Sequence, residues 1–110
     1  MNTELCYLYR DACNYKTCFE CVLQGKVSLD EIEPYLHDGD FFIPSQVCLP
    51  DLQGTRLGPD DHVWHEIASI ELVPDAPTVM ISAQEFMQAF KHASTAGWDI
   101  RGVLAAKGIL

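Results

Sequence analysis

The segment DDHVWHEI, residues 60–67, holds the side chains that proteins most often use for metal binding and acid–base catalysis. On a helix, His62, His65 and Glu66 would share one face at spacings of three and four residues, close enough to ligate one metal ion. On a strand, His62 and Glu66 would lie roughly 13 Å apart and His65 would point to the opposite face. Whether this segment forms a local site therefore depends on its secondary structure.

If the segment is a strand, a metal site would have to combine His62 and His65 with ligands such as Asp60 and Asp61. The histidines can instead be structural, because a neutral imidazole satisfies buried polar groups without taking part in catalysis. We expect this structural role, with no bound metal or other cofactor. The alternative is a small metal-dependent or acid–base enzyme that uses Asp11, His62, His65 and Glu66.

Cysteines form a second candidate set. Cys18 and Cys21 have the spacing of a redox pair or of half a zinc site, and Cys6 and Cys13 could complete four thiolates. The strand pattern around the pair sends Cys18 and Cys21 to opposite faces, which separates their thiols. We therefore predict reduced, buried or half-buried thiols, since an odd number of cysteines is a poor disulfide framework.

A polar loop supplies the candidate binding residues. Residues 9–16, YRDACNYK, contain two of the seven basic residues, and loops on a rigid scaffold often carry binding groups. Arg10, Asn14 and Lys16 could contact an anion or an acidic group, although Asn and Asp also hydrogen-bond the backbone of their own loop. The aromatic binding candidates outside this loop are Phe41, Phe42 and Trp64.

The charge balance limits the classes of partner. Sixteen acidic and seven basic residues give a net charge of −9, which disfavours direct contact with nucleic acid or an anionic membrane. The sequence shows neither a secretory signal pattern nor an apolar run that could span a bilayer, so we expect a cytoplasmic protein with protein partners. A homodimer stays open. An acidic surface could also mimic a phosphate backbone and inhibit a basic partner, with Asp30, Glu31, Glu33, Asp38 and Asp40 as its row of charges.

The elements that must position these residues begin with a hairpin. Residues 5–10 and 17–24 are rich in aromatic and other strand-forming residues and flank a polar loop, which predicts two antiparallel strands. A loop of about six residues would place Arg10 opposite Thr17 and Cys6 opposite Cys21. The side chains of the core face would then be Cys6, Leu8, Phe19, Cys21 and Leu23.

Two helices are predicted by capping boxes, one after Ser28 and one after Ser82. The first, near 29–37, should be short or bent because Pro34 lacks an amide proton; the second, over 83–95, has a continuous apolar stripe.

Between the helices, residues 38–52 are interrupted by prolines and predict extended pieces at a sheet edge. Residues 62–73 are rich in β-branched side chains, which favours a strand over a helix. We therefore expect an α+β fold: residues 1–96 form a single domain, an antiparallel sheet covered on one face by two helices. Residues 97–110 would be a C-terminal extension, either a short helix or an apolar tail.

Three segments together resemble a group of small uncharacterised bacterial proteins: YRDACNYK at 9–16, DGDFFIPSQVCLPDL at 38–52 and DDHVWHEI at 60–67. The pattern of that group has a small hydroxyl residue in place of Cys13 and lacks the cysteine pair, and residues from 97 onward are an addition to it. The resemblance implies no activity and no cofactor. It implies one defining core that includes Arg10, Asp11, Asn14, Tyr15, Lys16, His62, Trp64, His65 and Glu66.

These observations favour a non-enzymatic protein-interaction or regulatory module, which would contact its partner through the apolar FFIP segment at 41–44 or through the tail. The small enzyme and the nucleic-acid mimic are the alternatives.

Overall fold

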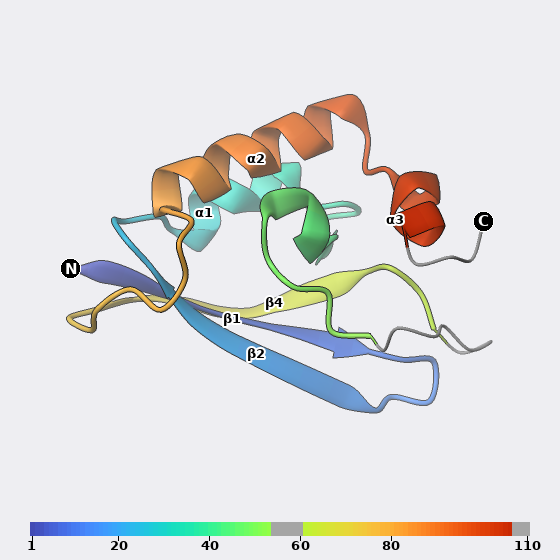
Figure 1. Ribbon diagram of the computed structural model, residues 1–110, viewed down its shortest axis with the longest axis horizontal. Coiled ribbons are helices and arrows are strands. Elements are labelled where there is room, and N and C mark those ends of the chain that lie inside the picture. The colour runs from blue at the N-terminus through green and yellow to red at the C-terminus, as the bar shows by residue number, and fades with distance from the viewer. Residues whose placement is uncertain (54–60, 107–110) are drawn as a thin grey trace.

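Four antiparallel strands form one sheet, and the helices lie over one of its faces (Figure 1). The computed structural model describes residues 1–53 and 61–106. The strands stand in the order β2-β1-β4-β3, so β2 and β3 are the two edges. In chain order the elements are β1 (Asn2–Arg10), β2 (Lys16–Leu23), α1 (Leu29–Ile32), the 3₁₀ helix η1 (Glu33–Tyr35), β3 (Phe41–Phe42), the 3₁₀ helix η2 (Pro44–Val47), β4 (His65–Val73), α2 (Ala83–Ala96) and α3 (Ile100–Ala106).

The β1–β2 hairpin is confirmed, but its predicted register is wrong by one residue. Arg10 lies opposite Lys16 and Leu5 lies opposite Cys21. The reason is a tighter loop, 11–15, in which the carboxylate of Asp11 accepts hydrogen bonds from the backbone N–H of Cys13 and of Tyr15, both at 2.9 Å.

A slip of one residue reverses the faces of a strand. The side chains of β1 that point into the core are therefore Leu5, Tyr7 and Tyr9, not Cys6 and Leu8 as the predicted register requires. The predicted core face of β2 holds, with Cys21 and Leu23 buried and Phe19 packed against the same core. The observed register buries two tyrosine rings in place of a thiol and a leucine.

The strand predicted over 62–73 is confirmed from His65 onward, where β4 pairs with β1. At the sheet edge, β3 is extended as expected and pairs with the start of β4. The prediction of extended structure fails for Pro44–Val47, which forms η2. Proline at the first position of a helix has a suitable φ and needs no hydrogen-bond partner for its nitrogen, so Pro44 starts this turn.

Both predicted capping boxes are present. The backbone N–H of Ser28 donates to Glu31 Oε2 at 2.8 Å, and the backbone N–H of Glu85 donates to Ser82 Oγ at 3.1 Å. The first helix is short, as Pro34 predicts, because α1 gives way to η1 after Ile32. The second helix, α2, runs to Ala96 and ends at Gly97, whose φ of 81° suits glycine.

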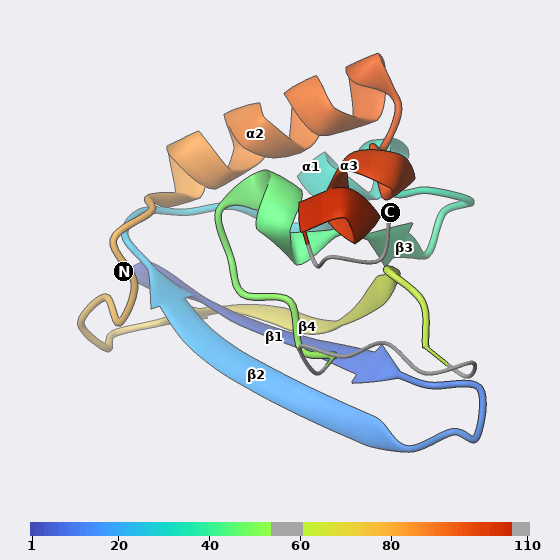
Figure 2. The ribbon, with the colours of Figure 1, turned by 45° about the vertical axis from the view of Figure 1, so that its right-hand side comes forward.

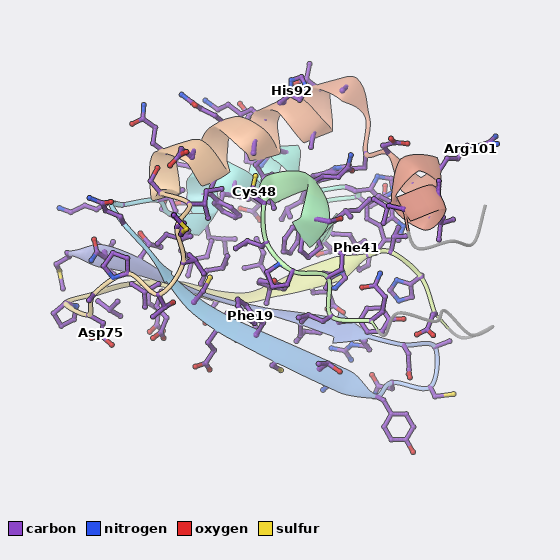
Figure 3. The ribbon with its side chains drawn as sticks, in the orientation of Figure 1. Phe19, Phe41, Cys48, Asp75, His92 and Arg101 are labelled. Atoms are coloured by element: carbon purple, nitrogen blue, oxygen red, sulfur yellow. The ribbon has the colours of Figure 1, made fainter. Side chains whose placement is uncertain are left out.

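The core lies between the sheet and α2. Phe42, Phe86 and Phe90 are fully buried there with Tyr7, and each buried ring of this size contributes about 1.5–3 kcal/mol by leaving water. Side chains fill this space, whereas Arg101 on α3 lies on the outside (Figure 3).

The segment after Gly97 folds back onto the body of the molecule. Trp98 packs edge-on against Phe90, with ring centroids 5.2 Å apart. The helix α3 lies beside η2 (Figure 2), where the backbone N–H of Asp99 donates to Gln46 Oε1 at 2.9 Å. Of the two forms expected for this segment, the described part adopts the helix. None of the helices in the described ranges has the length and apolar character needed to cross a membrane.

Candidate functional site

His65 is held by backbone groups on both ring nitrogens. Its side chain is fully buried; Nε2 accepts a hydrogen bond from the N–H of Leu52 at 2.9 Å, and Nδ1 lies 3.1 Å from the carbonyl oxygen of Val63. Because Nε2 accepts, it carries no proton, and because Nδ1 faces a carbonyl, it carries one. The ring is therefore neutral, and it ties β4 to the segment that follows η2.

His62 is held in the same way with the opposite tautomer. Its Nδ1 accepts from the N–H of Trp64 at 3.0 Å, and its Nε2 donates to the carbonyl oxygen of Arg10 at 2.7 Å. The lone pair that a metal would need is used by a backbone N–H in both rings. The chain bends at Val63, where the N–H of Trp64 is bonded to His62 and not to a neighbouring strand, and β4 begins at His65.

Asp61 anchors the same segment to β1. The hydroxyl of Tyr9 donates to Asp61 Oδ1 at 2.6 Å and accepts from the N–H of His62 at 3.1 Å. Burial, with a smaller contribution from the hydrogen bond to Asp61, raises the pKa of Tyr9 to about 12. Tyr9 therefore stays a neutral hydroxyl and acts as a structural link at neutral pH.

Arg10 is paired within the chain. Its Nε lies 3.2 Å from Glu66 Oε2, and its Nη1 donates to Asn14 Oδ1 at 2.8 Å. Two of the donors that could hold an external anion are thus occupied by the protein itself, while Lys16 is exposed at the start of β2. These contacts join the hairpin loop to β4.

The residues proposed for an enzyme do not converge on one point. His65 and Glu66 are neighbours on a strand and so point to opposite faces, with His65 in the core. Asp11 serves its own loop. Among residues 1–53 and 61–106, no group of three or more His, Cys, Asp or Glu side chains is placed to hold a metal ion, and Asp60 lies outside the described residues.

The cysteines follow the strand pattern. Cys18 is exposed and Cys21 is buried on the other face of β2, as alternation predicts, and Cys6 is half-buried. The prediction of buried or half-buried thiols is wrong for Cys18, on the solvent face of β2, and for Cys13 and Cys48, which are exposed in turns. Burial raises the pKa of the Cys21 thiol to about 11, and burial also raises the pKa of Cys6. All five cysteines lie in the described ranges, and none of them forms a disulfide.

The FFIP segment is not the exposed surface that we predicted. Phe42 and Ile43 are fully buried and Pro44 is buried with them, because Phe42 is the inward residue of β3 and meets Tyr7 edge-on at 5.5 Å. Phe41 is half-buried. The aromatic candidate Trp64 stacks on His37, with centroids 4.2 Å apart and planes 7° apart.

The proposed row of acidic side chains is exposed and follows α1, η1 and the next turn. Glu31 is also part of a helix cap, and Asp38 lies 3.4 Å from Nε2 of His37. Nucleic-acid mimicry by this row stays a prediction.

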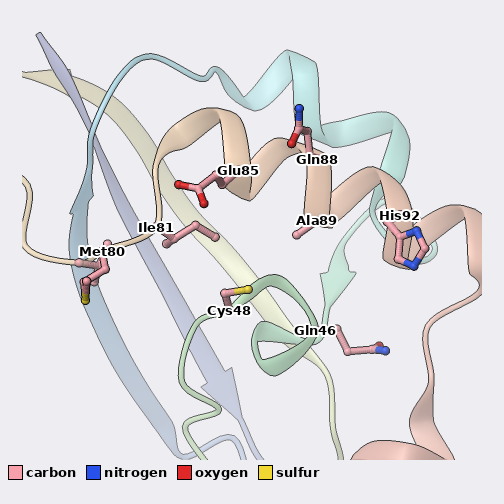
Figure 4. A pocket seen from close by; sticks show the side chains of 9 residues that line it. Gln46, Cys48, Met80, Ile81, Glu85, Gln88, Ala89 and His92 are labelled. Carbon is pink, nitrogen blue, oxygen red and sulfur yellow. The ribbon is translucent and has the colours of Figure 1, made fainter.

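A groove that sequence reasoning missed lies between α2, η2 and the loop before α2. Its volume is about 800 Å³. Figure 4 shows Cys48 on one side, Glu85 and Ala89 on α2, and Met80 and His92 at the two ends. We call it the α2 groove; the residues that line it are Gln46, Cys48, Val79, Met80, Ile81, Glu85, Gln88, Ala89 and His92.

The loop that borders the groove is anchored at both ends. The N–H of Thr78 donates to the carbonyl of Val22 at 2.9 Å, and the N–H of Ala83 donates to the carbonyl of Gln24 at 2.8 Å. Between these points Val79 and Ile81 pack against the core, and the side chain of Met80 is fully exposed. The apolar run Val-Met-Ile, two residues after Pro77, was the one signal in the sequence for this surface.

No protein-family model matches this chain, and no significant match to a curated protein or to a solved structure is found. The resemblance to small bacterial proteins therefore stays a prediction.

Proposed function

We propose that the chain is a non-enzymatic protein-interaction module and that the α2 groove is its binding surface. The observation that carries this proposal is the fully exposed side chain of Met80 beside an apolar floor that includes Val79, Ile81 and Ala89. An exposed methionine beside this floor is available for contact with a partner, and methionine adapts its shape to different partners. This surface takes the place of FFIP in our original hypothesis.

The size and charge of the groove favour one chemical class of partner. A volume of about 800 Å³ suits a few side chains of an extended segment rather than the face of a whole domain. Glu85 lines the groove, and the net charge of the whole chain is −9. Both favour a basic residue in the ligand. We therefore expect a peptide segment that combines apolar side chains with Lys or Arg.

The chemistry of the groove favours binding over catalysis. Cys48 and His92 both line it, but a thiol nucleophile needs a base within hydrogen-bond distance. No hydrogen bond joins Cys48 to His92 in the described part of the chain. Glu85 accepts a hydrogen bond from the N–H of Ser82 at 3.2 Å and so already serves the start of α2.

We place this module in the bacterial cytoplasm. The resemblance to bacterial proteins supports the source, and five cysteines without a disulfide support a reducing compartment. Fractionation of cells that express the natural gene would test the location.

Selection of peptides from a random display library against the full chain tests the function. We expect enriched peptides with apolar and basic residues, whose affinity falls at least tenfold, about 1.4 kcal/mol, for Met80→Asp. Tyr15→Asp is the matched control, because Tyr15 is also a large exposed side chain but lies in the hairpin loop. Circular dichroism would verify that both variants fold. Enriched peptides that bind both variants equally, or no enrichment at all, would contradict the proposal.

A further inference from the structure

The outer edge of β2 presents backbone groups that point away from the sheet. β2 is an edge strand, and successive residues of an antiparallel strand turn their N–H and C=O groups to alternate sides. Val22 turns outward, since its N–H donates to Thr78 Oγ1 at 2.8 Å and its C=O accepts from the N–H of Thr78 at 2.9 Å. By alternation, Lys16, Cys18 and Glu20 also turn outward.

These three residues form a free edge. In the described part of the chain, no hydrogen bond reaches the outward backbone groups of Lys16, Cys18 or Glu20, and the side chains of all three are exposed. Figure 1 shows β2 open along this stretch, whereas the loop before α2 approaches only its far end. The free edge therefore begins at Lys16 and ends before Val22, whose outward backbone groups bond Thr78.

We propose that a second copy of this chain pairs with this edge, β2 against β2, about a twofold axis at Cys18. In an antiparallel pairing, outward residues must face outward residues. Only a centre at Cys18 uses all three, with Cys18 opposite Cys18 and Lys16 opposite Glu20 of the second copy. If the axis lay closer to Val22, the pairing would need the backbone groups of Val22, which already bond Thr78. If the axis lay closer to the hairpin loop, Glu20 would have no partner in the other strand. The chosen register forms about six backbone hydrogen bonds.

Side chains support the same register. Lys16 of each copy faces Glu20 of the other, so the axis generates two opposite-charge pairs directly across the strands. On the other face of the sheet, Thr17 faces Phe19, a β-branched residue opposite an aromatic one. A twofold interface requires a self-complementary surface, and this edge is self-complementary in its backbone groups and in its charges.

Edge charges can also serve to prevent pairing, and a charge swap separates the two roles. The test is sedimentation equilibrium of the full chain under reducing conditions. We expect a dimer, a dissociation constant at least tenfold larger for Lys16→Glu, and recovery in the double variant Lys16→Glu/Glu20→Lys. Lys26→Glu is the matched control, because Lys26 is an exposed lysine outside β2. A monomer at several hundred micromolar, or a dimer that tolerates Lys16→Glu, would overturn the proposal.

Hydrogen exchange on the unmodified chain gives a second test that needs no variant. Dimerisation should slow exchange at the amides of Cys18 and Glu20 as the protein concentration rises, while the exposed amides of α1 stay unchanged. Exchange at Cys18 that is independent of concentration would count against β2 pairing. Peptide binding at the α2 groove should survive Lys16→Glu, so a failure of the dimer and a failure of the proposed function can be told apart.

Discussion

At the scale of single residues, side chains typical of catalysis are used here to complete the backbone hydrogen bonding of an irregular segment. His65 joins Leu52 to Val63, and His62 joins Arg10 to Trp64. The residue types of the DDHVWHEI segment were visible in the sequence. Their partners were not, because His62 bonds a residue 52 positions away whose proximity depends on the fold.

Replacement of His65 by phenylalanine should test this structural role. Phenylalanine keeps the ring but leaves the N–H of Leu52 and the carbonyl of Val63 without their buried partner, and each such group costs about 1–3 kcal/mol. We expect the free energy of unfolding, measured with urea, to fall by about 2–6 kcal/mol. Glu66→Gln is the control, since it breaks only a surface pair worth about 0–1 kcal/mol. Equal, small effects of both substitutions would show that His65 has no such role.

At the scale of elements, the long strands and the helices α1 and α2 could be predicted, but the register of the hairpin and the helix η2 could not. Capping boxes and β-branched residues are local signals, and they marked α1, α2 and β4 correctly. The register depended on one residue of loop length, set by the two hydrogen bonds to the carboxylate of Asp11. Local signals also failed to predict η2, because a proline can stand at the start of a helical turn as well as in an edge strand, and Pro44 starts a turn.

The core face of the β1–β2 hairpin should make the protein sensitive to alkali. Tyr9 has a pKa of about 12 against an ordinary 10.0, and Cys21 one of about 11 against 9.0; burial is the main cause in both, and it also raises the pKa of Tyr7. The folded state thus holds protons that the unfolded state releases first. Their stabilisation is complete below pH 9 and is lost as pH rises toward 12.

We therefore expect the free energy of unfolding to fall above pH 9, by up to about 1.4 kcal/mol per pH unit for each group. Urea titrations between pH 8 and pH 11 would measure this fall. Cys21→Ala should reduce the part that begins near pH 9, to which Cys6 also contributes, and leave the tyrosine part above pH 10. A stability that stays constant to pH 11 would refute the assignment.

At the scale of the whole molecule, the binding surface that we propose is built from segments that are distant in sequence. The α2 groove combines η2, the loop before α2 and α2 itself, and only the Val-Met-Ile run hinted at it. The C-terminal segment also contacts residues that are distant from it in the sequence. Val103 joins a buried cluster with Ile43 and Val63, and Trp98 packs against this cluster and the main core.

This packing predicts that the C-terminal segment is required for stability rather than being a separable tail. A variant that ends at Ala96 loses Trp98 and Val103, and so exposes Phe90 and Val63 to water. Loss of side chains of this size costs about 3 kcal/mol or more, which is a large part of the stability of a small domain. Thermal unfolding should show a midpoint lowered by at least 10 °C, about 4–8 °C per kcal/mol.

The matched control is a variant that ends at Ala106, which keeps both Trp98 and Val103. Its midpoint should stay close to that of the full chain, because the buried contacts of the described segment are retained. If the variant ending at Ala96 unfolds at the same temperature as this control, residues 97–106 contribute nothing to the core and act as an appendage. A lowered midpoint confined to the shorter variant would instead show that residues 97–106 belong to the folding unit. The buried cluster of Ile43, Val63 and Val103 is shared between the body of the molecule and α3.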